Sequence, residues 1–270
     1  MSTRIAVSYK KEGKEVEKDR VFDFLDRWAY VDYFDPEKEH PEFEKDSFRI
    51  YDLYHMAKTR DTSLKDLRRA ENKGVKTINP YSGAKLVDDR YESIKVLEKK
   101  GINVPKSEYG RFDEISLEFP LVSKERFEGD GHDIELIKTP YRGKKFVQEF
   151  INYDDSFKLY KVGENIRCVM LSCRGFFDRD YVSSVEIGVD EYMEDIVEDI
   201  SEVTGLKLFE VDVLKSHKGL YVVDVNSMVG LQNVNDGVEI YNELLMRESG
   251  FSKKYFFPGK YIRDIPFDSC

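Results

Sequence analysis

The sequence predicts an α+β protein that begins as an α/β lobe and continues as antiparallel sheet. In the first part, strand-like segments at 4–8, near 49–53 and at 75–79 alternate with amphipathic helical patterns, one of which runs from Thr62 or Ser63 to Gly74. From residue 115 to 169 several strand-like segments follow one another, separated by turn-forming clusters. The change of pattern predicts a parallel sheet with helices, followed by antiparallel sheet.

The remaining elements follow the same signals. The segment 34–46 is acidic and contains two prolines, so we expect a loop there. A helix at 88–100 should end at Gly101, and another at 190–204 has apolar residues at helical spacing. A β-hairpin, LKLFEVDVLKSHKGLYVVDVN, then leads to a helix at about 237–246.

Composition limits the size of the protein and its class. With 270 residues, of which 40% are hydrophobic and 36% charged, the chain can form a core but is short for three full-sized domains. The net charge of −10 argues against a nucleic-acid binder, because phosphate contacts need a basic face. No segment approaches the roughly 20 apolar residues of a membrane span. We therefore expect a cytoplasmic monomer, without membrane or nucleic-acid partners, and with reduced thiols at the three cysteines.

The hairpin offers a candidate metal site. Side chains alternate faces along a strand, so Asp224 and Asn226 should share one face, with Val223 and Val225 on the other. If the turn places Asp212 opposite Asp224, the two Cβ atoms lie about 4.5 to 5.5 Å apart. Two carboxylates so close repel each other unless a cation lies between them, and Mg²⁺ prefers oxygen ligands. The alternative is a half-exposed hairpin with acidic residues facing solvent.

Two further segments are candidates for nucleotide contacts. Lys124 lies near the end of a strand and is followed by a glycine-containing loop with His132, a loop that could close over a triphosphate. The strand KKFVQEFIN ends in Gln148, Glu149, Phe150 and Ile151, which could line an adenine pocket. An ordinary surface hairpin is the alternative for the first segment.

The order of these segments resembles the ATP-grasp superfamily from about residue 74 to 246: lysine strand, glycine loop, strand ending in QEFI, K-x-x-x-V-G strand pair, helix, Asp strand and D-x-N strand. The resemblance implies an ATP-grasp fold, in which two antiparallel-sheet lobes grip ATP. We expect an N-terminal α/β lobe on the acceptor side at 1–83, a central lobe at 84–153 and a C-terminal lobe with the metal site at 154–270.

Within that superfamily three passages resemble the inositol phosphate kinases: DDRYESIKVLEKKGINVP, GDGHDIELI and QEFINYDDSFKLYKVGE. The likeness implies transfer of the γ-phosphoryl group of ATP to an inositol phosphate or another phosphorylated polyol, with two Mg²⁺ ions. It implies ATP contacts from Arg90, Lys124 and the QEFI segment. Ser156 stands where those kinases have a ribose-binding acid, so Asp155 is expected to take that role.

The same resemblance implies catalytic roles for Lys158, His132 and Arg174 at the transferred phosphate, and metal ligation by Asp212, Asp224 and Asn226. A polyanionic acceptor needs cations near the cleft, and the N-terminal lobe offers Lys10, Lys11, Lys58 and Arg60.

Two other functions fit the same ATP site. A carboxylate–amine ligase, similar to glutamate ligases that modify a ribosomal protein, would use it to form an acyl phosphate. Such ligases usually resemble D-I-R where this chain has Phe157-Lys158, and they lack the loop histidine, so the sequence favours the kinase. A nucleotide sensor without turnover is a third possibility, although the full set of metal ligands argues against it.

Overall fold

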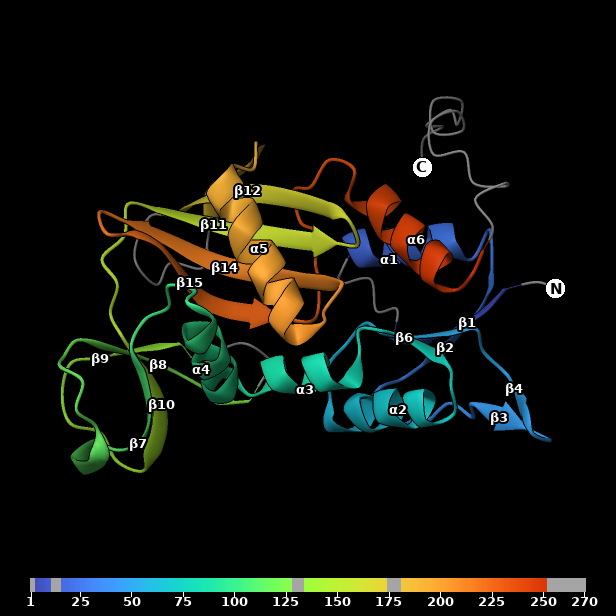
Figure 1. Cartoon of the computed structure of the whole chain (residues 1–270), viewed down its shortest axis with the longest axis horizontal. Coiled ribbons are helices and arrows are strands. Elements are labelled where there is room, and N and C mark those ends of the chain that lie inside the picture. The colour runs from blue at the N-terminus through green and yellow to red at the C-terminus, as the bar shows by residue number, and fades with distance from the viewer. Residues whose placement is uncertain (1–2, 11–15, 128–133, 174–180, 252–270) are drawn as a thin grey trace.

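The computed structural model describes residues 3–10, 16–127, 134–173 and 181–251. Three larger sheets and one small ribbon make up the strands of this part of the chain (Figure 1). Strand and helix alternate around a parallel N-terminal sheet, and two antiparallel sheets follow it. This is the α+β architecture that the sequence predicts.

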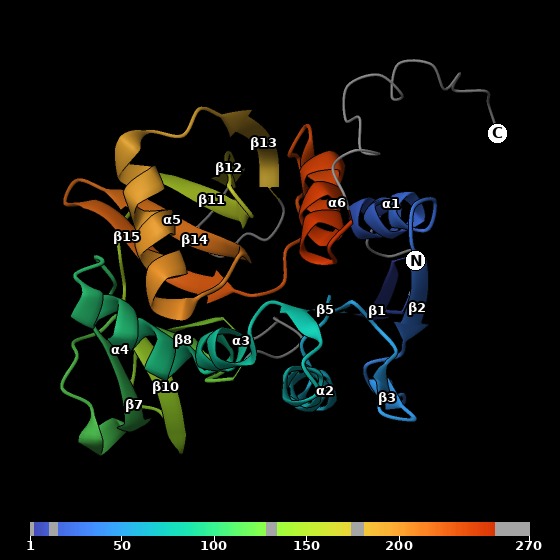
Figure 2. The ribbon, with the colours of Figure 1, turned by 45° about the vertical axis from the view of Figure 1, so that its right-hand side comes forward.

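The N-terminal sheet is parallel, with the strand order β2-β1-β5-β6. Its strands are β1 (Arg4–Ser8), β2 (Tyr30–Phe34), β5 (Leu53–Met56) and β6 (Lys76–Ile78). Neighbouring residues of a strand point to opposite faces, so Ile5 packs with helices α1 (Val16–Leu25) and α6 (Gly237–Glu248), whereas Ala6 packs with α2 (Asp61–Asn72). Figures 1 and 2 show α1 and α6 on one face of this sheet and α2 on the other.

Two expectations for this lobe are wrong in position. The strand expected at 49–53 lies at 53–56, because Phe48–Arg49 (β4) turns back to pair with Glu44–Lys45 (β3) in a separate ribbon. Helix α2 begins at Asp61, before either predicted cap. Ser63 lies in its first turn, where its hydroxyl accepts a hydrogen bond from the Arg60 N–H at 2.8 Å, as a side chain near a helix start often does.

The second sheet is antiparallel, with the order β7-β10-β8-β9. Its strands are β7 (Ser107–Arg111), β8 (Leu121–Lys124), β9 (Glu135–Ile137) and β10 (Lys144–Glu149), with a 3₁₀ turn at Phe112–Glu114. Two helices, α3 (Tyr81–Asp88) and α4 (Arg90–Lys100), connect it to the N-terminal sheet. The helix expected at 88–100 corresponds to α4 alone. It begins at Arg90, because Asp89 caps it by accepting a hydrogen bond from the Glu92 N–H.

The third sheet is antiparallel and has the order β13-β12-β11-β14-β15. Its strands are β11 (Asp155–Val162), β12 (Asn165–Cys173), β13 (Tyr181–Ile187), β14 (Leu208–Ser216) and β15 (Gly219–Asn226). Helix α5 (Glu191–Thr204) packs its apolar side, including Val197 and Ile200, on one face of this sheet. Part of the other face, including Tyr160 and Val162, packs in a core with α6, and Lys158 and Asp212 lie further along that same face.

A buried asparagine joins the N-terminal lobe to this sheet. The Asn79 side chain is 2% exposed. Its amide nitrogen donates to the Leu208 carbonyl at 2.6 Å, and its oxygen accepts from the N–H groups of Lys207 and Leu208 at 3.0 and 2.9 Å. All of these bonds are buried or half-buried, so they fix the start of β14 relative to the end of β6.

A second buried contact joins β5 to helix α6. The His55 side chain is fully buried, and its Nδ1 lies 3.1 Å from the Ile78 carbonyl oxygen. A carbonyl can only accept, so Nδ1 bears the proton and Nε2 accepts from the Tyr241 hydroxyl at 2.7 Å. Burial lowers the pKa of His55 from 6.5 to about 4, which keeps the ring neutral at neutral pH.

This contact predicts a pH dependence of stability. Because the pKa of His55 is about 4 in the folded chain and 6.5 when unfolded, the unfolded chain binds the extra proton between these values. The free energy of unfolding should then fall by about 2 to 3 kcal/mol from this residue alone as the pH drops from 7.5 to 4.5. The His55→Gln variant cannot gain this charge. The difference in free energy of unfolding between the natural chain and this variant should therefore shrink by about 2 to 3 kcal/mol over the same pH range.

Urea unfolding of both proteins at the two pH values measures the effect. Other groups titrate in the same window, but they do so in both proteins and cancel in the difference. Stability curves that run parallel from pH 7.5 to 4.5 would contradict this account of His55.

Candidate active site

The β14–β15 hairpin brings two carboxylates opposite each other. Asp212 pairs with Asp224, and Glu210 pairs with Asn226, across a two-residue turn at 217–218. The predicted register of Asp212 and Asp224 is thereby confirmed. The pair lies on the face of the sheet opposite α5, because Val211 and Val225 beside them belong to the core under that helix.

A bulge in β15 corrects the predicted alternation. The pairing passes from Asp212↔Asp224 to Val213↔Val222, so Val223 is an extra residue in its strand. Val222 and Val225 are both buried, whereas Val223 is half-buried and does not share the core face with Val225 as expected. The Val223 carbonyl accepts a hydrogen bond from Lys124 Nζ at 2.8 Å, so the bulge turns a backbone acceptor toward β8.

Lys158 lies at the centre of the acidic face. It pairs with Asp212 across β11 and β14, and its Nζ lies 2.9 Å from Glu210 Oε1 and 3.3 Å from Asp212 Oδ1. Burial lowers the pKa of Lys158, but the attraction of Asp212 and Glu210 outweighs burial and raises the pKa above its ordinary value. Lys158 is therefore a permanently charged cation between two acids.

Two more cations reach the hairpin from the second sheet and α4. Arg90 lies at the start of α4, and its Nε is 3.2 Å from Asp224 Oδ2; both side chains are nearly buried, at 12% and 13% exposed. The other end of the Arg90 guanidinium donates to the Glu125 carbonyl at 3.0 Å. Burial lowers the pKa of Lys124, and the charge of Asp224 opposes that shift.

This cluster has the chemistry that a magnesium–nucleotide complex requires. Three cations, Arg90, Lys124 and Lys158, face three carboxylates on two neighbouring strands. In the described part of the chain, no group of three His, Cys, Asp or Glu side chains is arranged to hold a metal. Two carboxylates and an amide oxygen, those of Asp212, Asp224 and Asn226, could hold a metal together with phosphate oxygens, a ligand set that Mg²⁺ commonly uses.

The predicted adenine segment lies between two sheets. Gln148 is buried, and its amide nitrogen donates to Ser107 Oγ at 3.2 Å, while the Glu149 carboxylate accepts from the Lys106 N–H at 2.9 Å. Phe150 and Ile151 are half-buried. Asp155 lies beyond them at the start of β11, with an ion pair to Lys215 at 3.8 Å. This segment connects β10 to β11, and the roles predicted for it stay predictions.

The predicted acceptor-side cations do not all gather at the hairpin. Lys10 lies 3.9 Å from Asp35, and Arg60 Nε lies 3.5 Å from Glu37 at the start of α2. Lys58 is half-buried in the same β5–α2 loop, where its carbonyl accepts from Ser63 Oγ. Lys11, His132 and Arg174 lie outside the described residues, and their predicted roles are untested.

Sequence reasoning missed two residues, Glu210 in this site and Arg167 beside it. Glu210 shares a face with Asp212 at i and i+2, and this alternation could have identified it. Burial raises the pKa of Glu210, and Lys158 opposes the shift. Arg167 lies on β12, and its Nε is 3.0 Å from Asp236 and 3.6 Å from Glu186. These ion pairs hold the 227–236 loop against the sheet. No local motif marks that long-range contact.

Several solved ATP-grasp proteins have a fold similar to that of this chain. A RimK domain ATP-grasp protein from Sphaerobacter thermophilus superimposes with a TM-score of 0.69 at 18% identity, over 92% of this chain and 99% of that one. The D-alanine–D-alanine ligase of Bacillus anthracis, in complex with ATP, gives 0.67 at 15% identity over 93% and 99%. The ATP-grasp ligase PsnB, bound to a precursor peptide and AMPPNP, gives 0.69 at 12% identity over 92% and 97%. The chain has the ATP-grasp fold, as the sequence predicts.

Sequence comparisons find similarity to a RimK-like domain and to glutamate ligases. A RimK-like ATP-grasp domain model matches residues 178–247, which include α5 and the hairpin. The chain is 25% identical to the coenzyme gamma-F420-2:alpha-L-glutamate ligase of Methanocaldococcus jannaschii over 192 residues, 62% of this chain and 67% of that protein. It is 22% identical to a probable alpha-L-glutamate ligase of Enterobacter sp. over 225 residues, 73% and 74% of the two chains.

These relatives correct the predicted function. These comparisons give no support for the expected likeness to inositol phosphate kinases. The kinase activity and the phosphorylated-polyol acceptor derived from that likeness are wrong, because the relatives are named glutamate ligases. The lysine strand and the D-x-N hairpin that suggested a kinase do not distinguish the two classes, because the resemblance assigns both segments to ATP and metal binding. His132, the loop histidine expected to distinguish a kinase from a ligase, lies outside the described residues.

Proposed function

We propose that this chain is an ATP-dependent carboxylate–amine ligase. In such a reaction a substrate carboxylate attacks the γ-phosphorus of ATP, which releases ADP and leaves an acyl phosphate. An amine then attacks the acyl carbon and inorganic phosphate departs, so an amide bond forms. The observation on which the proposal rests is the facing pair Asp212 and Asp224 between Lys158 and Arg90, in a chain whose relatives are named glutamate ligases.

ATP with Mg²⁺ fits this cluster because the metal would partner the carboxylates and the phosphates would partner the basic side chains. Asp212, Asp224 and Asn226 would hold Mg²⁺, whose chemistry is to neutralise the phosphate oxygens. Arg90 and Lys124, now on Asp224 and the Val223 carbonyl, would then face the phosphates. Lys158 lies within reach of Asp212 and is suited to the transferred phosphoryl group, whose charge must be stabilised as the bond breaks.

The substrates follow from the relatives by analogy. We propose an α-amino acid such as glutamate as the amine, and as the carboxylate either a small molecule or the end of a peptide. The ATP-grasp ligases of similar fold include one bound to a precursor peptide and one that joins D-alanine to D-alanine.

Product analysis tests the reaction class. The protein is incubated with Mg-ATP, a panel of amino acids and a panel of carboxylic acids and peptides, and ADP, free phosphate and new amides are measured. We expect ADP and phosphate in equal amounts, together with a new amide detected by mass spectrometry. Hydroxylamine should intercept the acyl phosphate as a hydroxamate. ADP without free phosphate, with a phosphorylated product, would contradict the ligase.

A further inference from the structure

An ion pair joins the start of α4 to the chain that follows β8. Arg126 Nε donates to Asp89 Oδ1 at 2.9 Å, and Arg126 Nη2 donates to Asp89 Oδ2 at 2.7 Å. Two parallel N–H···O bonds of this kind fix the orientation of both groups as well as their distance. The side chains are 26% and 15% exposed, so solvent screens the pair less than it screens one at the open surface.

The backbone makes the same connection. Asp89 and Phe127 form an isolated antiparallel bridge. The Arg90 N–H donates to the Arg126 carbonyl at 2.8 Å. Arg90 Nη1 donates to the carbonyls of Glu125 and Phe127 at 3.0 and 3.4 Å. The Arg90 guanidinium is therefore oriented by the chain segment 125–127, which the ion pair attaches to α4.

The Asp89 carboxylate makes two contacts at once. Its Oδ1 accepts from the Glu92 N–H at 3.3 Å, the contact that caps α4, and also from Arg126 Nε. Burial alone would raise the pKa of Asp89, but the hydrogen bonds from Arg126 and from the backbone lower it below its ordinary value. Asp89 is therefore ionised at neutral pH and carries the charge that the ion pair requires.

Aromatic rings hold the Arg126 guanidinium in place. Its central carbon lies 4.8 Å from the centroid of the Tyr109 ring on β7 and 5.5 Å from that of Tyr91 on α4. The Phe127 ring is 5.3 Å away. A guanidinium within about 6 Å of a ring face is attracted to it. Arg126 thus connects β7 and α4 to the end of β8, and only a planar, forked cation makes all of these contacts.

This ion pair lies next to two cations of the charged cluster. Arg126 follows Lys124 by two residues, and the carboxylate that it holds precedes Arg90 by one. Arg90 Nε lies 3.2 Å from Asp224 Oδ2. Lys124 Nζ donates to the Val223 carbonyl at 2.8 Å. The two cations therefore reach neighbouring residues of β15, where the phosphates of ATP are proposed to lie.

We propose that Asp89 and Arg126 are positioning residues for ATP, whose ion pair holds Arg90 beside Lys124 in the orientation that meets a phosphate. This inference rests on the proposed ligase function and adds two residues to its ATP site. The Arg126 guanidinium is committed to a carboxylate and to aromatic rings, so it acts through Arg90 and not by contact with the nucleotide.

Nucleotide binding by the full chain tests this role. Arg126→Gln should raise the Kd of Mg-AMPPNP about tenfold in calorimetry, because Arg90 then loses the orientation in which it makes a charge-assisted contact with phosphate. Asp89→Asn keeps a side chain that caps α4 but removes the charge, and it should have a similar effect. Adenosine has no phosphate, so its Kd, measured by NMR of the ligand, should stay the same in both variants.

A double variant distinguishes positioning from direct contact. If Arg126 acts through Arg90, the single variant Arg90→Gln already loses what Arg126 contributes. The double variant Arg90→Gln, Arg126→Gln should then bind Mg-AMPPNP no more weakly than Arg90→Gln alone. Losses that add up in the double variant would show that Arg126 reaches the nucleotide without Arg90, and they would overturn the proposal.

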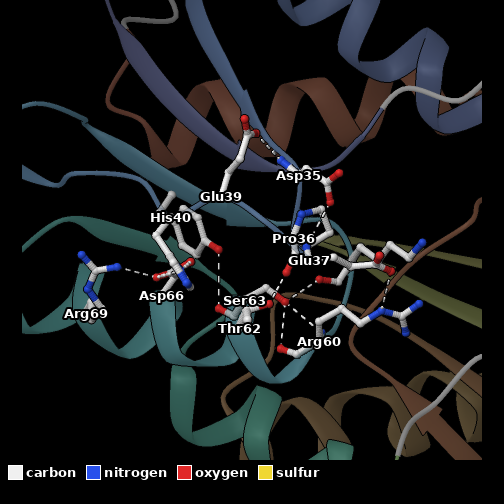
Figure 3. Close-up of polar contacts among 12 residues, drawn as sticks. Asp35, Pro36, Glu37, Glu39, His40, Arg60, Thr62, Ser63, Asp66 and Arg69 are labelled. Carbon is white, nitrogen blue, oxygen red and sulfur yellow. Dashed lines mark hydrogen bonds and ion pairs between the residues drawn. The ribbon is translucent and has the colours of Figure 1, made fainter.

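A second ion pair serves as the matched control. Figure 3 shows Arg69 and Asp66 on α2, where Arg69 Nη1 lies 2.7 Å from Asp66 Oδ1, and Arg69→Gln should bind Mg-AMPPNP like the natural chain. If Arg126→Gln is unstable, Arg126→Lys keeps the charge without the fork and should show a smaller loss. Unchanged Mg-AMPPNP binding by the folded Arg126 variants, or equal weakening of adenosine, overturns the proposal. Failure of the natural chain to bind Mg-AMPPNP would instead overturn the ligase function.

Discussion

Asp224→Asn is expected to reduce amide formation by on the order of 10³-fold while the protein stays folded. The substitution keeps the shape of the side chain but removes a negative charge that would ligate Mg²⁺, and a catalytic metal stabilises the transition state by several kcal/mol. The loss should appear in kcat, with ADP, phosphate and amide falling together. It is measured with the same coupled assay that tests the reaction class.

The ion pair of Asp224 with Arg90 requires a control for this prediction. Both side chains are nearly buried, so removing one charge leaves the other without its partner and lowers stability as well. The midpoint of thermal unfolding must therefore be measured in parallel, with Asp195→Asn on the exposed side of α5 as the matched change of charge. Full turnover by a folded Asp224→Asn protein would rule out the metal role.

The sequence predicted those elements whose signals are local. The helix at 190–204 is capped by Asp190, which accepts from the Met193 N–H at 2.8 Å, and it ends at Gly205 with a positive φ, so both ends were readable. The strand at 4–8 has one apolar run with no competing pattern. By contrast β7 and β13 were missed, because SEYGR and YVSSVEI are edge strands with little apolar alternation.

The candidate site was predictable where residues are neighbours on one strand or across one turn. Asp212, Asp224 and Asn226 follow from alternation and a tight turn, and Lys158 came from a family motif. The bulge at Val223 left no mark in the sequence, although it explains why Val222 and Val225 share the core. The cavity lined by Glu37, Arg60 and Asp88 could not be predicted at all, since it depends on three segments that meet only in the folded chain.

A sequence motif can identify the fold of a protein without identifying its reaction. The D-x-N hairpin and the lysine strand predict a site for metal and phosphate, and this prediction is the same for kinases and ligases. The choice between these classes depends on what receives the phosphoryl group, and neither motif carries that information. A resemblance based on the shared half was sufficient for the fold and led to the wrong acceptor.

Lys158→Met is expected to have two separable effects, on turnover and on stability. Loss of the cation should lower kcat by about 10² to 10³-fold, the range seen when one group that stabilises transition-state charge is removed. It also leaves Glu210 buried without the ion pair at 2.9 Å, which typically costs about 3 to 5 kcal/mol. The pKa of Glu210, already raised by burial, should then rise further, so the variant should lose stability as the pH increases.

The double variant Lys158→Met, Glu210→Gln tests whether these effects have different origins. Removing the stranded acid should restore most of the stability measured by urea unfolding and abolish its new pH dependence, whereas turnover should stay low because the cation is still absent. Glu210→Gln alone leaves Lys158 beside Asp212 at 3.3 Å and should retain more activity than Lys158→Met. If the double variant regained turnover together with stability, Lys158 would be a structural partner of Glu210, and the phosphoryl-stabilising role would pass to Arg90 and Lys124.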